Sequence, residues 1–257
     1  MRAKTRQRRF AERWGGAAGA LLLAGAAVLN GPLTAMRRER GLASAAAPEG
    51  APPLIAVTTV ALGGFRGLLV DAMWVRIGRL QAEGRYFEIV QLANWITRLE
   101  PRSSAVWAYH AWNLAYNVGG LMPSPDDRWR WVRHGIALLR DEGLVFNPGD
   151  SRLYAELSWL FQDKIGSTTD PAHRTYKRRL AEAVERFLPG GRLDRMDAAR
   201  RDAFRETWKM DPERMRTLEE DIGPLDWRGP FAHAAYWASA GLPFAEVNPP
   251  EAMADDP

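Results

Sequence analysis

Apolar residues recur at intervals of three and four along the middle of the chain, a spacing that predicts helices. One stripe ends at Leu80, and a turn at Gly84 separates it from a second stripe that ends before Pro101. The first stripe comprises Met73, Ile77 and Leu80, and the second comprises Ile89, Leu92, Ala93, Ile96 and Leu99. Later helices are predicted at 196–208, 211–222 and 230–240. Because no segment alternates in the manner of a strand, we expect an all-α fold.

Two stretches resemble each other at a constant offset of 47 residues. PRSSAVWAYHAWNLAYNVG begins at Pro101, and PGDSRLYAELSWLFQDKIG begins at Pro148. The matching pairs are Ser104 with Ser151, Trp107 with Tyr154, Ala108 with Ala155, Trp112 with Trp159, Leu114 with Phe161 and Gly119 with Gly166. Such self-similarity is typical of stacked supersecondary units that cannot bury their apolar faces alone.

A third unit is expected after Asp170-Pro171, which has the form of a helix N-cap followed by proline at the first helical position. Its apolar stripe comprises Ala172, Tyr176, Leu180, Val184 and Phe187. The sequence PGGRLDR at 189–195 then ends this unit, and the later helices form a C-terminal extension at 189–242.

The segment EGRYFEIVQLANWITRLEPRSSAVWAYHAWNLAY resembles the tetratricopeptide (TPR) pattern. The positions that carry the resemblance are Trp107 and Tyr154 as opening aromatics, Ala111 and Ser158 as small residues, Gly84 and Tyr86 at the turn, Ala93 on the second helix, and Pro101 and Pro148 as closing prolines. His110 stands where the pattern usually has leucine, and an insertion at 119–127 lengthens the second unit. The chain is similar to membrane-anchored bacterial TPR-like proteins. The resemblance implies a TPR-like α-solenoid of about three helical hairpins over 54–188.

The N-terminal part has the pattern of a membrane anchor. Residues 14–36 carry no charge and are long enough to span a bilayer as one helix, and the basic segment 1–13 precedes them. This arrangement predicts a cytoplasmic N-terminus and a single pass through the bacterial inner membrane, with the body in the periplasm. The alternative is a signal peptide cleaved near Ala43-Ser44-Ala45, which would also export the body.

The segments that flank the predicted repeats have distinct compositions. Residues 37–53 read as a flexible linker, and 54–65 as either a buried lead-in helix or an interfacial segment too short to span a membrane. The proline-rich, acidic segment 243–257 is predicted to be a disordered tail.

Charge and cysteine content exclude several function classes. The first 40 residues carry nine Lys and Arg against two Glu, a segment charge of +7, so the rest of the chain, at +4 overall, carries −3. A body with that balance does not favour nucleic-acid binding. The absence of cysteine excludes disulfides, thiolate metal sites, covalent c-type haem and cysteine nucleophiles.

The tryptophans of the repeated helices predict a surface for a protein partner. Trp107 and Trp112 are five residues apart, about 140° around a helix, so they face different sides. In the TPR family, the side that corresponds to Trp112 lines a groove for extended peptides. The predicted protein-binding residues are Trp74, Trp112, Tyr116, Trp159, Gln162 and Asp163. The alternative is that these tryptophans pack against neighbouring units.

No motif predicts a catalytic, cofactor-binding or metal-binding residue. The four histidines lack metal-ligand spacing, and the chain has no glycine-rich phosphate loop, GxSxG elbow or HExxH. The basic segment RTYKRRL reads as a solvated face, and GPLDWRGP as a structural turn in which Asp226 pairs with Arg228 or caps a helix.

The interpretation is a non-enzymatic, membrane-anchored scaffold or assembly subunit that binds another membrane or envelope protein. The alternative is an exported hydrolase or lyase in which carboxylates converge in the tertiary structure, with Glu156, Asp163 and His173 as an example. The oligomeric state is not predicted.

Overall fold

The computed structural model describes residues 65–245, in which every regular element is a helix and no strand occurs. The predicted basic tail 1–13, anchor 14–36 and linker 37–53 lie outside the described residues, as do most of 54–65 and most of the tail 243–257. Between residues 65 and 245, no helix combines the length and the apolar character needed to cross a membrane. The chain divides into two compact units, residues 1–79 and 80–257.

Helix α3 (Phe65–Ala82) contains the first predicted stripe and Trp74, and nearly all of it belongs to the first unit. The turn predicted at Gly84 is present, and Gly84 adopts the left-handed conformation with φ +70°. Its N–H donates to the carbonyl of Gln81 at 3.0 Å. Glycine is favoured there because a side chain would strain this backbone conformation.

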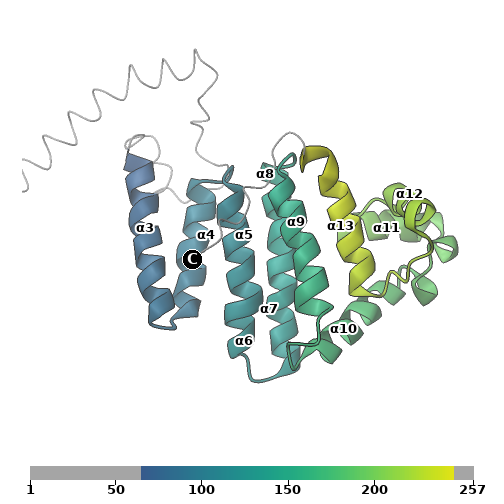
Figure 1. The fold of residues 1–257 in the computed structure, drawn as a ribbon, viewed down its shortest axis with the longest axis horizontal. Coiled ribbons are helices and arrows are strands. Elements are labelled where there is room, and N and C mark those ends of the chain that lie inside the picture. The colour runs from purple at the N-terminus through teal and green to yellow at the C-terminus, as the bar shows by residue number, and fades with distance from the viewer. Residues whose placement is uncertain (1–64, 246–257) are drawn as a thin grey trace, which may run out of the picture. The chain divides into compact units, whose positions relative to one another are not determined.

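The second unit contains all the remaining described helices (Figure 1). They are α4 (Tyr86–Leu99), α5 (Ser104–Trp112), η1 (Asn113–Val118), α6 (Gly119–Leu121), α7 (Pro125–Ala137), η2 (Leu138–Gly143), α8 (Leu144–Phe146), α9 (Ser151–Trp159), η3 (Leu160–Ile165), α10 (His173–Glu185), η4 (Pro189–Gly191), η5 (Leu193–Arg195), α11 (Ala198–Trp208), α12 (Pro212–Ile222) and α13 (Pro230–Ala245). Elements η1, η2 and η3 are π-helical, whereas η4 and η5 are short 3₁₀ turns.

The repeat predicted from the sequence is also a repeat of local structure. Helix α5 and the π turn η1 begin and end at positions that match α9 and η3 after a shift of 47 residues. The aromatic residue that opens each helix contacts the proline before it: Trp107 Nε1 donates to the Pro101 carbonyl, and Tyr154 Oη donates to the Pro148 carbonyl, both at 2.8 Å. Equivalent side chains therefore hold the entry to both helices in the same way.

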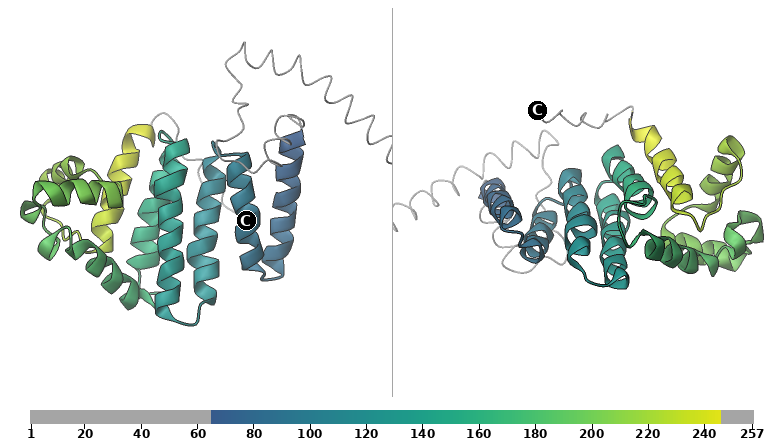
Figure 2. Two further views of the ribbon diagram at one scale, coloured as in Figure 1. Left: turned by 180° about the vertical axis from the view of Figure 1, so that it is seen from behind. Right: turned by 60° about the horizontal axis from the view of Figure 1, so that its bottom comes forward.

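The repeated helices lie side by side, and α13 covers α9 from the other side (Figures 1 and 2). Two glycines permit close approach of helices. A Cβ on Gly135 of α7 would lie 2.7 Å from the Ala111 carbonyl oxygen, and a Cβ on Gly241 of α13 would lie 2.6 Å from Tyr154 Cβ. Both separations are too short for a real Cβ, so glycine sets the spacing between these helix pairs.

The buried core of the second unit follows the predicted stripes. Ile89, Ala93, Ile96 and Leu99 of α4 are buried, as are Ala172, Tyr176, Leu180 and Val184 of the third unit. The helices predicted at 196–208, 211–222 and 230–240 are present as α11, α12 and α13. Asp211 caps α12 by accepting the Glu213 N–H, with Pro212 at the first helical position.

Two sequence predictions require correction. Asp170 is not an N-cap, because α10 begins at His173; its carboxylate instead accepts the Ala172 N–H and pairs with Lys164. Helix α13 continues to Ala245 with Pro243 inside it, so the helical extension does not end at residue 242. Pro243 has no N–H to donate to the Ser239 carbonyl four residues earlier, and that carbonyl accepts from Arg214 at 3.4 Å instead.

The segment GPLDWRGP is a structural turn, as predicted. Asp226 pairs with Arg228 at 2.9 Å, and Trp227 is fully buried with its Nε1 donating to Glu219 Oε1 at 2.8 Å. The Trp227 backbone N–H donates to the Gly191 carbonyl, which ties this turn to the glycine turn after α10.

Candidate functional site: an aromatic surface on the repeated helices

The predicted site residues of the second unit meet where the two repeated helices lie side by side. Trp112 ends α5 and Trp159 ends α9, at equivalent positions of the repeat. The Trp112 and Tyr116 rings stack with centroids 5.6 Å apart and planes 20° from parallel. Tyr116 Oη donates to Asp163 Oδ2 at 2.6 Å, a bond between residues 47 positions apart in the sequence. We refer to Trp112, Tyr116 and Trp159 as the aromatic surface.

The two aromatic positions of each repeated helix differ sharply in burial. Trp107 is 2% exposed, whereas Trp112 is 38% exposed and Trp159 is 50% exposed. Of the residues that open the helices, Trp107 packs in the interior and Tyr154 is half-buried. Those that close them present large apolar faces to solvent, within the described part of the chain.

The other predicted site residues have different surroundings. Asp163 is half-buried and holds the Tyr116 hydroxyl, whereas Gln162 beside it is exposed. Trp74 lies on α3, almost all of which belongs to the first unit, so its role in binding a protein partner stays a prediction.

The electrostatics of the aromatic surface keep Tyr116 protonated. Burial, followed by the hydrogen bond to Asp163, raises the pKa of Tyr116 well above its usual range, and hydrogen bonding from Trp159 opposes part of this shift. The pKa of Glu156 is also raised, because burial disfavours its charged form more than Arg152 stabilises it. The phenol thus remains a hydrogen-bond donor at any physiological pH.

A buried cation lies directly behind the aromatic surface. Lys164 is 6% exposed, and its Nζ lies 4.7 Å from the centre of the Tyr116 ring. The same ammonium donates to Asp170 Oδ2 at 2.7 Å, and the Tyr176 hydroxyl donates to that oxygen at 3.1 Å. The ion pair with Asp170 offsets the free-energy cost of burying the Lys164 charge. The contact of the ammonium with the Tyr116 ring face helps to fix the position of that ring.

Sequence reasoning missed the ion pair between Lys164 and Asp170. Lys164 lies inside the π turn η3, where hydrogen bonds from residue i to i+5 rotate the later side chains away from their α-helical positions. An angle of 100° per residue does not describe that turn. The matching π turns therefore decide which side chains share a face. No pattern of residues in the sequence predicts a π turn at these positions.

The residues named for the enzymatic alternative do not share a pocket in the part of the second unit considered next. Three pockets there are lined by other residues, and Glu156, Asp163 and His173 line none of these three. Asp163 accepts the Tyr116 hydroxyl, and His173 Nδ1 lies 3.3 Å from Lys177 Nζ on the same helix. Between residues 65 and 245, no three His, Asp or Glu side chains are arranged to hold a metal ion.

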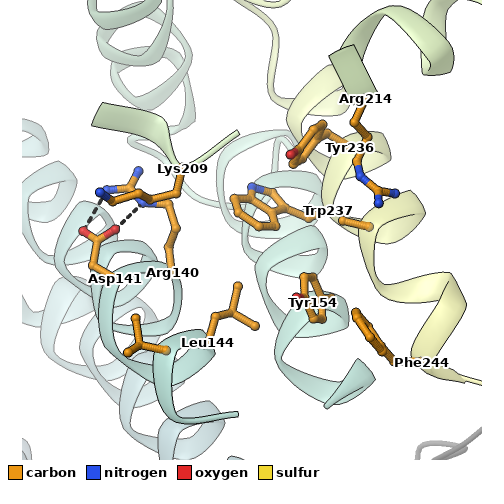
Figure 3. Close-up of a pocket in the computed structure, with 11 residues that line it drawn as sticks. Arg140, Asp141, Leu144, Tyr154, Lys209, Arg214, Tyr236, Trp237 and Phe244 are labelled. Atoms are coloured by element: carbon orange, nitrogen blue, oxygen red, sulfur yellow. Dashed lines mark hydrogen bonds and ion pairs between the residues drawn. The ribbon is translucent and has the colours of Figure 1, made fainter. Parts of the chain in front are cut away.

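One of these pockets joins cationic and aromatic side chains that the sequence did not associate (Figure 3). Its cations, Arg140, Lys209 and Arg214, come from three elements far apart in the sequence, namely η2, the end of α11, and α12. Because no local motif contains them, only the tertiary structure places them on one pocket.

Comparison of the chain with protein-family models, curated proteins and solved structures finds no match.

Proposed function

We propose that this chain is a membrane-anchored helical-repeat scaffold or assembly subunit that binds another envelope protein through the aromatic surface. The proposal includes a TPR-like α-solenoid and one transmembrane helix at 14–36, with the body on the periplasmic side of the bacterial inner membrane. The observation that carries it is the pair Trp112 and Trp159, exposed at equivalent positions of two adjacent repeated helices.

The chemistry of the aromatic surface favours a partner segment with positively charged side chains. Aromatic faces attract cations, and the contact between Lys164 and the Tyr116 ring is one instance within the chain itself. Asp163 and Glu156 add carboxylates beside the rings, from the same helical segment as Trp159. An extended segment that carries arginine or lysine would meet both kinds of group.

Anchoring to the membrane would strengthen such an interaction. A weak site gains effective concentration, up to the order of millimolar, when it is confined near its partner. A binding surface of a few aromatic residues is then sufficient for a stable complex. A membrane or envelope protein is therefore the expected partner, and no nucleic acid is expected.

The test is co-purification of the full chain from native membranes in mild detergent, followed by mass spectrometry of stoichiometric partners. A Trp112→Ala, Trp159→Ala double variant should lose the partner and keep its helicity by circular dichroism. Trp95→Ala is the matched control, because Trp95 is 41% exposed on α4 but lies outside the aromatic surface. Equal capture by both variants would exclude the aromatic surface as the binding site.

A second candidate function is an exported hydrolase or lyase, and the raised pKa of Glu156 is the observation that favours it. A carboxyl group whose pKa is raised by burial is a candidate general acid. Under this hypothesis, a Glu156→Gln variant would lose hydrolytic or lyase activity and still capture the partner. Under the scaffold proposal, the same variant has no activity to lose.

A further inference from the structure

Helix α13 exposes one uncharged face along its length. None of its 16 residues is Asp, Glu, Lys or Arg. Phe231 is 60% exposed and Leu242 is 66% exposed; between them, Ala238 is exposed and Ala235 is half-buried. These four residues recur at intervals of four, three and four, so they share one side of the helix, and we refer to them as the α13 stripe. Because a solvated helix face usually carries charged residues, an apolar stripe of this kind indicates a binding surface.

The opposite side of α13 packs on α9, and the two helices lie side by side (Figure 1). At the start of α13, a Cβ on Gly166 would lie 3.1 Å from Cε1 and Cζ of Phe231. At its end, Phe244 stacks on Tyr154 near the start of α9, with ring centroids 5.5 Å apart. The helices are therefore antiparallel. The rings of Tyr154 and Trp237, 6.3 Å apart, mark the line along which they touch.

The α13 stripe and Trp159 lie on the same side of this helix pair. Trp159 lies about 140° further around α9 than the contact residue Tyr154, at about 100° per residue. The α13 stripe is centred about 130° further around α13 than the contact residue Trp237, in the same sense of rotation. Because the helices are antiparallel, similar rotations away from their contact lead to the same side. The aromatic surface therefore continues onto α13.

The charges beside Trp159 on this face include two carboxylates. Glu156 lies one turn before Trp159 on α9, and Asp163 lies one turn after it in η3. Glu156 is half-buried and, among the described residues, forms no ion pair. Arg152, at the start of α9, acts on Glu156 only through its field. A cation from outside the chain would give Glu156 the partner that it lacks.

We propose that the aromatic surface and the α13 stripe together bind one basic and apolar segment of a protein partner. A lysine or arginine of that segment pairs with Glu156 beside the aromatic rings, and apolar side chains that follow it pack on Trp159 and the α13 stripe. This binding mode rests on the proposed function, and adds to it a third helix and the composition of the partner segment. A second copy of the chain would present the same carboxylates, and an anionic lipid surface would meet like charge, so neither supplies the cation.

The test places a reporter on the α13 stripe of the full chain, in nanodiscs of phosphatidylcholine. Because the chain has no cysteine, Ala238→Cys provides one attachment point for an environment-sensitive nitrobenzoxadiazole fluorophore. Ala203→Cys is the matched control, since Ala203 is exposed on α11, away from this face. The label reports directly whether a bound peptide reaches α13.

The probe is a decapeptide in which two arginines are followed by leucine and then phenylalanine, at intervals of three residues. Three residues of an extended chain span about 10 Å, the distance between neighbouring helix axes. The counterpart peptide has glutamate in place of both arginines. The basic probe should shift the emission saturably at position 238 and not at position 203, and it should bind about tenfold or more tightly than the acidic counterpart.

Two substitutions separate the charge from the apolar contact, with the affinity of the probe measured by fluorescence anisotropy on the unlabelled chain. Glu156→Gln should weaken binding of the basic probe about tenfold or more, because it removes the charge partner. Phe231→Ala should weaken it by about tenfold, because a phenylalanine side chain is no longer covered. Glu220→Gln, at an exposed carboxylate on α12, is the control and should keep the parent affinity. Circular dichroism checks that each variant keeps its helicity.

The proposal is overturned if the basic probe does not bind at millimolar concentration, or if the acidic counterpart binds equally well. It is also overturned if the label at position 238 is already in an apolar environment before peptide is added, which would mean contact with lipid. A dimer in mild detergent that Ala238→Lys separates into monomers would mean a second copy, with the same consequence. If the native partner is still lost in the Trp112→Ala, Trp159→Ala variant, the proposed function stands and only the extension onto α13 fails.

Discussion

The buried histidine His233 should make the second unit sensitive to mild acid. Its side chain is fully buried, stacks on Phe161 at 4.8 Å, and has Trp208 at 5.1 Å. Its Nε2 lies 2.8 Å from the Trp227 carbonyl oxygen, so it carries the proton and donates to that oxygen. Burial lowers the pKa of His233 from 6.5 to about 4; the Trp227 hydrogen bond opposes this shift, and Arg140 adds to it.

The sign and size of the effect follow from linkage. Below pH 6.5 the unfolded chain binds a proton at this imidazole, and the folded chain does not bind it until the pH approaches about 4. Stability therefore falls as the pH drops from 6.5 towards 4. At pH 5 the loss from His233 is about 2 kcal/mol relative to pH 7.5. That loss is a large fraction of the stability of an ordinary domain.

The assay is urea unfolding of the full chain in mild detergent, followed by tryptophan fluorescence at pH 7.5 and at pH 5. The comparison is between the parent and His233→Gln, whose side-chain amide can still donate to the Trp227 carbonyl. Any packing defect of the variant acts equally at both pH values, so the difference between the two losses isolates the proton. The variant should lose about 2 kcal/mol less than the parent between pH 7.5 and pH 5.

A parent and variant with the same loss of stability between the two pH values would refute this reasoning. It would mean that His233 is protonated in the folded chain, and hence that water or an acidic group reaches it. The same comparison can be made independently at His110, because burial, as the largest cause, also lowers the pKa of His110 to about 4.

Three further changes have definite expected outcomes. Gly241→Ala should destabilise the chain by about 1–3 kcal/mol in thermal unfolding, because the new Cβ would lie 2.6 Å from Tyr154 Cβ; Gly120→Ala, with nothing within 4 Å of its Cβ, should not. Lys164→Met should cost about 3 kcal/mol in urea unfolding by leaving the largely buried Asp170 carboxylate with only the longer Arg128 pair, and adding Asp170→Asn should restore part of that loss. The pKa of Asp170 is lowered, because hydrogen bonds from Lys164 and other donors outweigh the effect of burial. The stability of the parent should therefore fall as the pH drops below about 4, and that of the Lys164→Met, Asp170→Asn variant should fall less steeply.

Most of the helical architecture could be predicted from local pattern. The stripes in α4 and α10 correspond to buried faces, because an amphipathic helix must bury its apolar side whatever it packs against. The repeat at a constant offset of 47 residues could also be predicted from the sequence. Equivalent helices keep equivalent side chains that bond to the proline before the helix, as Trp107 and Tyr154 do.

The aromatic surface was predictable only in part. Position on the helix was enough to separate the buried Trp107 from the exposed Trp112. The contact of Tyr116 with Asp163 depends on two π turns in matching register, and that of Lys164 with Asp170 depends on a chain reversal after η3. Neither follows from a regular helical angle, because each depends on how neighbouring segments pack.

The sequence alone determined the helical class of the described chain, the repeated pair of helices and the aromatic residues that distinguish their two sides. Only the tertiary structure decided that α13 returns to cover α9, and that Arg140, Lys209 and Arg214 line one pocket with Trp237. The physical reason is the range of the interactions. Helix formation and amphipathic burial depend on residues three to seven positions apart, so they can be predicted from local sequence. A pocket depends on contacts between segments that lie far apart in the sequence.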